Sequence, residues 1–101
     1  MSRYVLTPLA VEDLREIARY TEKQWGAIQT ERYGEELELA LQQLSLAPEV
    51  GKKRDAIALG VRSFRVAQHV AFYLIRRNEI TILRILHPRR NANEEIGRAS
   101  W

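Results

Sequence analysis

Three consecutive strand-like segments in the second half of the chain constrain the fold more than any other feature. They are residues 61–66, 69–75 and 79–86. Each is rich in β-branched and aromatic residues and ends at a short polar break. The breaks are Ala67-Gln68 and residues 76–78, where Asn78 tolerates the left-handed backbone of a tight hairpin. The segments predict an antiparallel meander that ends before Pro88.

Alternation along these segments predicts a sheet with apolar side chains on both faces. The middle segment places Val70, Phe72 and Leu74 on one face and Ala71, Tyr73 and Ile75 on the other. The same period of two in the last segment groups Arg84 with Ile82 and Leu86. It places Ile85 on the opposite face. Neither face is therefore expected to be plainly exposed to water.

Two amphipathic helices are predicted before the meander. Thr7-Pro8 begins the first helix and Gly26 ends it, and the second helix spans residues 27–46 and stops before Pro48. The first apolar seam is Ala10, Leu14, Ile17, Ala18, Thr21 and Trp25, and the second is Thr30, Tyr33, Leu37, Ala40, Leu41 and Leu44. A short turn makes the helices antiparallel, so both seams should face each other and the sheet.

The remaining segments complete the predicted architecture. Residues 3–6 fit a strand, residues 48–60 connect the hairpin to the sheet, and Lys52 and Lys53 are expected in that loop. Gly34 costs about 1 kcal/mol relative to alanine within a helix, and close helix packing is expected to offset this cost. The prediction is a single α+β domain over residues 1–101, with a tail at 91–101 and Trp101 folded back on the core.

Charge is divided unevenly along the chain. Residues 1–50 hold five basic and nine acidic side chains, whereas residues 51–101 hold eleven basic and four acidic ones. The basic half is expected to meet something acidic, which is either nucleic acid, an acidic protein segment or the helical half of its own fold. The chain has no cysteine and only two histidines, so no metal or cofactor is expected. With no long apolar run or signal-peptide pattern, a cytoplasmic protein without membrane contact is predicted.

The order of these segments resembles the ParE/RelE superfamily of bacterial toxin–antitoxin toxins, and the residues resemble its ParE branch. The matching pieces are YVLTPLAVEDLREIARYTEKQWG, the second helix ending in LAPEVGK, GVRSF, HVAFYLI and ITILRILHPRRN. The resemblance covers about residues 4–91. It implies a toxin that inhibits DNA gyrase by binding, is neutralised by a cognate antitoxin protein, and forms a toxin–antitoxin hetero-oligomer. In this interpretation the toxin is not an enzyme.

The alternative within the superfamily is a RelE-like toxin that cuts mRNA on the ribosome. Such cleavage needs a base, an acid and cations that stabilise the charge on the phosphate. The candidate catalytic residues are Arg62, Arg65, Arg84 and His87. Each also has a structural explanation, because arginine stems often cover apolar surface and a histidine before a strand-ending proline is usually structural. His69 is expected to pack or to form a hydrogen bond.

Arg89 and Arg90 are the predicted target-binding residues, because Pro88 should release both side chains from the sheet. The antitoxin is expected to lay an acidic or amphipathic segment against the helical hairpin and to add a strand to an open sheet edge. A non-toxic protein-binding module is a further alternative. Direct nucleic-acid binding is not expected, because Phe64, Phe72 and Tyr73 occupy core-like positions. The acidic residues of the helices are expected on solvent-facing sides.

Overall fold

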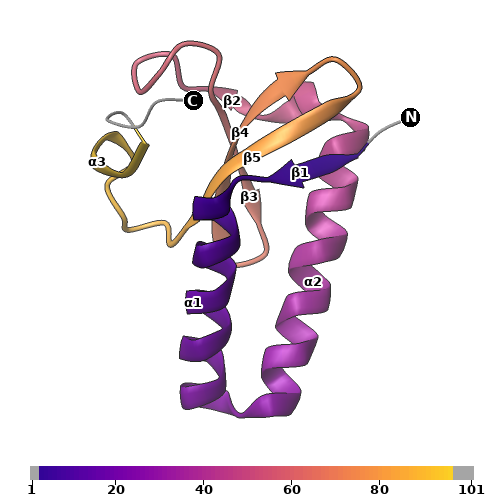
Figure 1. Cartoon of the computed structure of the whole chain (residues 1–101), viewed down its shortest axis with the longest axis vertical. Coiled ribbons are helices and arrows are strands. Elements are labelled where there is room, and N and C mark those ends of the chain that lie inside the picture. Colours follow the sequence, from indigo (N-terminus) through magenta and orange to yellow (C-terminus); the bar gives the residue numbers. More distant parts are fainter. Residues whose placement is uncertain (1–2, 97–101) are drawn as a thin grey trace.

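A helical hairpin, a five-stranded sheet and a short last helix make up the computed structural model, which describes residues 3–96 (Figure 1). The elements in chain order are β1 (Tyr4–Leu6), α1 (Pro8–Trp25), α2 (Ala27–Leu46), the 3-10 helix η1 (Pro48–Val50), β2 (Lys52–Lys53), β3 (Arg62–Val66), β4 (His69–Arg76), β5 (Glu79–Leu86) and α3 (Ala92–Ile96). This order confirms the predicted α+β arrangement of strand, helical hairpin and meander. None of the helices in residues 3–96 is long and apolar enough to cross a bilayer. The prediction for Trp101 lies outside the described residues.

The sheet has the strand order β1-β5-β4-β3-β2 and is mainly antiparallel. Its parallel pair is β1 with β5, where Tyr4 lies opposite Ile80. The placement of Lys52 and Lys53 in a loop was wrong, because they form β2 and Lys53 pairs with Arg62. Lysine is depleted in strands and two residues show no periodicity, so only backbone pairing with β3 reveals this strand.

The predicted bounds of both long helices are confirmed. The Thr7 hydroxyl accepts the Ala10 N–H at 3.1 Å and donates to the Leu83 carbonyl at 2.8 Å, so it caps α1 and ties it to β5. Gly26 separates the two helices, and its φ of 88° is a backbone conformation that glycine adopts readily. The tip of the hairpin extends beyond the sheet (Figure 1). The assignment of Trp25 to the seam was therefore wrong, since its side chain is 72% exposed.

Both faces of the sheet are apolar, as predicted. The face that packs on the hairpin contributes Val66, Ala71, Tyr73, Ile80, Ile82 and Ile85, which meet Leu37, Leu41 and Leu44 of α2. The opposite face contributes Val61, Phe72, Leu83 and Leu86, which meet Ile96 of α3. Residues 92–96 of the expected tail thus form a helix, because Ile96 completes this second cluster.

A β-bulge in β5 changes which side chains face the hairpin. Phe72 pairs with Arg84 but Tyr73 pairs with Ile82, which leaves Leu83 as the extra residue. The alternation reverses at this point, so Ile85 lies on the hairpin face with Ile82. The predicted grouping of Ile82 with Leu86 was therefore wrong, because a strict period of two contains no bulge.

Candidate functional site

An open groove of about 930 Å³ lies between the hairpin and the ends of the central strands. Its hairpin wall includes Tyr20, Trp25, Gln29 and Tyr33. Its sheet wall includes Arg65, Gln68, His69, His87, Arg89 and Arg90. One wall is thus rich in aromatic residues and the other in basic residues, and we call this feature the hairpin groove.

A hydrogen-bonded cluster connects the two walls of the hairpin groove. The Tyr33 hydroxyl accepts the backbone N–H of Gln68 at 2.9 Å and lies 2.6 Å from Nδ1 of His69. Its own proton can therefore point at Nδ1, which places the His69 proton on Nε2. The His87 ring lies edge-on to the His69 ring, with centroids 6.1 Å apart. The predicted hydrogen-bonding role of His69 is confirmed.

The environment of this cluster shifts two pKa values. Burial lowers the pKa of His69, and the neighbouring His87 and Arg65 lower it further, while Asp13 opposes the shift. Burial also raises the pKa of the Tyr33 hydroxyl. Both shifts favour the neutral form, so the cluster is an uncharged link between the hairpin and the turn before β4.

Arg84 is buried outside the hairpin groove in an ion pair that the sequence did not predict. Its Nε and Nη2 each lie 2.8 Å from a carboxylate oxygen of Asp13, and its Nη1 lies 3.1 Å from Oε2 of Glu95. Asp13 also accepts the backbone N–H of Ile85. The pKa of Arg84 is raised, chiefly by the hydrogen bonds to Asp13. Arg84 thus joins α1, β5 and α3.

Asp13 is an exception to the expectation that acidic residues occupy solvent-facing sides of the helices. Only 7% of the residue is exposed. Its position gave a signal, because Asp13 lies three residues after Ala10 and four before Ile17, which is the spacing of the seam. An acidic residue at a seam position requires a buried partner, and an arginine within an apolar strand is suited to that role.

Arg62 also lies outside the hairpin groove. Its Nη1 donates to the carbonyl oxygens of Glu49 and Gly51 at 3.1 and 3.0 Å, so it holds η1 beside β3. Of the four residues in the nuclease alternative, the groove brings together Arg65 and His87. Among residues 3–96, no group of three His, Cys, Asp or Glu side chains could hold a metal ion.

The predicted target-binding residues line the hairpin groove and are exposed. They differ in their contacts. Arg90 Nη2 lies 2.6 Å from Oε1 of Glu95, whereas the Arg89 backbone N–H donates to Nδ1 of His87 at 3.1 Å. Within residues 3–96, the Arg89 guanidinium makes no hydrogen bond or ion pair. Arg89 therefore offers an unneutralised charge, and Arg90 a partly neutralised one.

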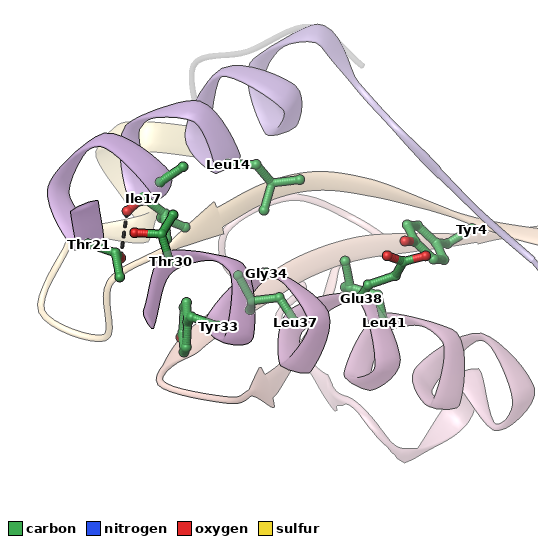
Figure 2. A pocket seen from close by; sticks show the side chains of 11 residues that line it. Tyr4, Leu14, Ile17, Thr21, Thr30, Tyr33, Gly34, Leu37, Glu38 and Leu41 are labelled. Carbon is green, nitrogen blue, oxygen red and sulfur yellow. Dashed lines mark hydrogen bonds between the residues drawn. The ribbon is translucent and has the colours of Figure 1, made fainter. Parts of the chain in front are cut away.

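A second, smaller hollow of about 220 Å³ lies between the two helices (Figure 2). Its apolar floor includes Leu14, Ile17, Leu37 and Leu41. Gly34 borders this hollow, and a Cβ built there would have nothing within 4 Å. The expected close packing at Gly34 was therefore wrong, because the helices are not in contact at this position.

Comparison with known proteins identifies the family of the chain that carries the hairpin groove. The sequence profile described as the ParE toxin of type II toxin-antitoxin system, parDE, matches residues 4–92. The chain belongs to this ParE toxin family. Membership confirms the predicted ParE branch of the superfamily.

Individual ParE proteins are similar over most of their length. Toxin ParE1 of Mycobacterium tuberculosis is 33% identical over 96 residues, covering 94% of this chain and 98% of the relative. Toxin ParE of Escherichia coli is 37% identical over 90 residues, covering 88% and 87%. A solved chain from the chromosomal ParDE TA system of P. aeruginosa has the same fold. It gives a TM-score of 0.72 at 24% identity and covers 86% of this chain and 95% of that one.

Proposed function

We propose that this ParE-family toxin binds and inhibits DNA gyrase in the cytoplasm and that a cognate antitoxin protein neutralises it. The placement of the arginines carries the argument for binding over catalysis. Arg62 and Arg84 direct their guanidinium groups at partners within the fold, so only Arg65 of the three arginines in the nuclease alternative lines the groove. Family membership supports gyrase as the target, because the resemblance to the ParE branch implies it.

The target contact in this proposal is the exposed basic rim at Arg89 and Arg90. Arginine forms charge-assisted hydrogen bonds with carboxylates, so an acidic surface of gyrase fits this rim. Both side chains follow the end of β5 and are exposed. The Glu95 carboxylate already offsets part of the Arg90 charge, so Arg89 should contribute more to target binding than Arg90.

The antitoxin in this proposal covers the hairpin and adds a strand to the sheet. The support is an incomplete edge, because β2 pairs with only Arg62 and Ser63 of the five residues of β3. Residues 64–66 thus present an outer edge on which an extended segment can pair, and Phe64 is exposed there. An acidic segment would complement the nearby Arg65.

Supercoiling by purified gyrase tests this proposal. The folded Arg89→Glu/Arg90→Glu variant should inhibit more weakly than wild type, and the deficit should be larger at low salt. Exposed charges are screened over about 10 Å at 0.1 M ionic strength. The matched control is Arg76→Glu/Arg77→Glu, which reverses two exposed arginines at the β4–β5 turn and should inhibit as wild type does.

Two outcomes would contradict the proposal. Supercoiling that wild-type toxin leaves unchanged would rule out gyrase inhibition. Equal loss in both double variants would show that general positive charge, rather than the rim, determines binding. Neutralisation is tested by adding the small protein encoded beside the toxin gene, which should bind the toxin and restore supercoiling.

The RelE-like nuclease is the second candidate, and the paired histidines of the hairpin groove favour it. His69 and His87 lie edge to face beside Arg65, an arrangement that can supply proton transfer and charge stabilisation. Growth arrest by a folded His87→Ala variant separates the candidates. Arrest should persist if the toxin binds gyrase, whereas loss of acid–base catalysis costs about 10²–10⁴-fold in rate. Abolished arrest, with cleaved mRNA in wild type, would favour the nuclease.

A further inference from the structure

The hairpin groove combines two features that single-strand-binding proteins use together, which are exposed aromatic rings and a basic wall. Tyr20 is 65% and Trp25 is 72% exposed on the hairpin wall. Arg65 and Arg89 are exposed on the opposite wall. Exposed rings stack on bases of any sequence, because every base has a flat π face, and arginines hold the phosphates.

The sequence argument against nucleic-acid binding placed the aromatic residues in the core. Phe72 and Tyr73 are indeed buried, but Phe64 is 40% exposed. Trp25 was assigned to the apolar seam and was not counted as available. The hairpin tip extends beyond the sheet (Figure 1). Tyr20 and Trp25 line the groove. The argument therefore holds for Phe72 and Tyr73 but does not apply to the exposed aromatic residues of the hairpin wall.

The charges that line the hairpin groove favour an anionic ligand. Its two acidic residues are Asp13 and Glu16. Asp13 is neutralised by Arg84. Arg89 has no ion pair among residues 3–96, and the Arg65 side chain, which also has none there, donates a 3.1 Å hydrogen bond to the Ala67 carbonyl. Arg65 and Arg89 therefore retain charges that no ion pair within residues 3–96 offsets, whereas Arg90 is paired with Glu95 and Glu16 is the one exposed acidic residue of the groove.

We propose that the hairpin groove binds a short stretch of single-stranded nucleic acid. Bases stack on Trp25 and Tyr20, and Arg65 and Arg89 hold the phosphates. The groove volume of about 930 Å³ lies near the upper end of the roughly 300–1,000 Å³ range of ligand pockets. Stacking requires unpaired bases, so the groove should prefer single strands over duplex. This binding does not depend on the identity of the protein target, and it shares Arg89 with the proposed target contact.

Tryptophan fluorescence tests the proposal directly. The chain has two tryptophans, so a Trp101→Phe background leaves Trp25 as the single reporter. Oligothymidine and oligouridine of about eight nucleotides are titrated at low salt, since one single-strand site spans roughly 4–16 nucleotides. We expect saturable quenching with both. The difference between the two affinities indicates whether DNA or RNA is the preferred source of the strand.

Variants assign the binding to the two walls. Trp25→Ala should weaken binding of a fluorescently labelled oligonucleotide about 5- to 150-fold, the range that corresponds to loss of one stacked base. Arg65→Ala and Arg89→Ala should each reduce the slope of log affinity against log salt by about 0.7. Arg77→Ala is the matched control, because Arg77 is exposed at the β4–β5 turn, away from the groove. Melting curves confirm that each variant is folded.

Several outcomes would overturn the proposal. These are absence of saturable quenching at low salt, an effect of Arg77→Ala as large as that of Arg65→Ala, or equal affinity for duplex and single strand. Tighter binding of a peptide of glutamate and aromatic residues than of either oligonucleotide would assign the groove to a protein segment. Cleavage of the bound oligouridine would support binding and would also favour the nuclease candidate.

Discussion

The two ends of the helical hairpin have the same sequence pattern but different surroundings. At the root, near the sheet, Leu41 and Leu44 of α2 are almost fully buried. At the tip, on either side of Gly26, Trp25 and Ile28 are exposed. Both helices are amphipathic, but the sheet covers only the root (Figure 1).

This difference separates stability from binding. Apolar surface contributes roughly 25 cal/mol per Å² only when it is removed from water, so the root stabilises the fold and the exposed rings at the tip do not. The tip becomes stabilising when a partner or ligand covers it. The same spacing of apolar residues can therefore mark a core at one end of a helix and a binding surface at the other.

A charge placed at the root and at the tip tests this comparison most strongly. Leu41→Asp should prevent folding, because an unpaired carboxylate in the core costs about 5 kcal/mol or more. Ile28→Asp should leave the melting temperature close to that of wild type, because Ile28 is exposed. Circular dichroism during heating measures both. A stable Leu41→Asp variant would disprove the assignment of the root.

Loss of the buried ion pair between Asp13 and Arg84 should cause the next largest loss of folding stability. Asp13→Ala leaves Arg84 without its bidentate partner and the Ile85 N–H without an acceptor, so it should cost about 3–5 kcal/mol. Glu12→Ala is the matched control on the same helix. Its contacts with Arg15 and Arg19 are exposed and are worth about 0–1 kcal/mol. Equal costs in urea unfolding would show that the buried pair is not a structural link.

The fold could be predicted from the sequence because its signals are local. Thr7, Pro8 and Gly26 mark the ends of the helices, and alternation along β4 gives both apolar faces. Features that depend on distant backbone were missed. The parallel pairing of β1 joins segments 76 residues apart, and the two-residue strand β2 and the bulge at Leu83 depend on the register with a neighbouring strand, which the pattern within one segment does not show.

The hairpin groove was predicted only in part, for the same reason. Arg65, His87, Arg89 and Arg90 were identified by residue type, and the structure places all four in one groove. The aromatic wall was missed, because helical spacing shows which side of a helix is apolar but not how far the sheet extends along it. Arg84 is buried because it pairs with Asp13, which is 71 residues away in the chain, so its sequence neighbours do not reveal this role.

A substitution at Gly34, which lies between the root and the tip, should have a smaller effect on the free energy of unfolding. Gly34→Ala should stabilise the protein by about 1 kcal/mol, because alanine is the better helix former and its methyl group would enter open space. Gly51→Ala is the contrasting control, because a Cβ there would collide with the Tyr73 ring and should be destabilising. If Gly34→Ala destabilises the protein in urea unfolding, the hollow between the helices is not open in solution.

The smallest expected change in stability comes from the protonation of His69, which links the hairpin to the turn before β4 through Tyr33. Burial lowers the pKa of His69 in the folded state, and the neighbouring His87 and Arg65 lower it further. The unfolded chain therefore binds a proton more readily, so the stability contributed by neutral His69 is present above about pH 6.5 and is lost as pH falls below it. The pKa of Glu95 is lowered mainly by Arg90, so its contribution is lost only below its ordinary pKa of 4.5.

Urea unfolding between about pH 7.5 and pH 5 isolates this contribution, since histidine titrates within that window and Glu95 does not. Wild type should lose stability as the pH falls, and His69→Gln should lose less, because glutamine has no proton to gain. His87→Gln is the control for the exposed neighbouring ring and should retain most of the wild-type pH dependence. If His69→Gln follows wild type while His87→Gln does not, His87 rather than His69 carries the pH dependence. The neutral link between the hairpin and the turn would then not require an unprotonated His69.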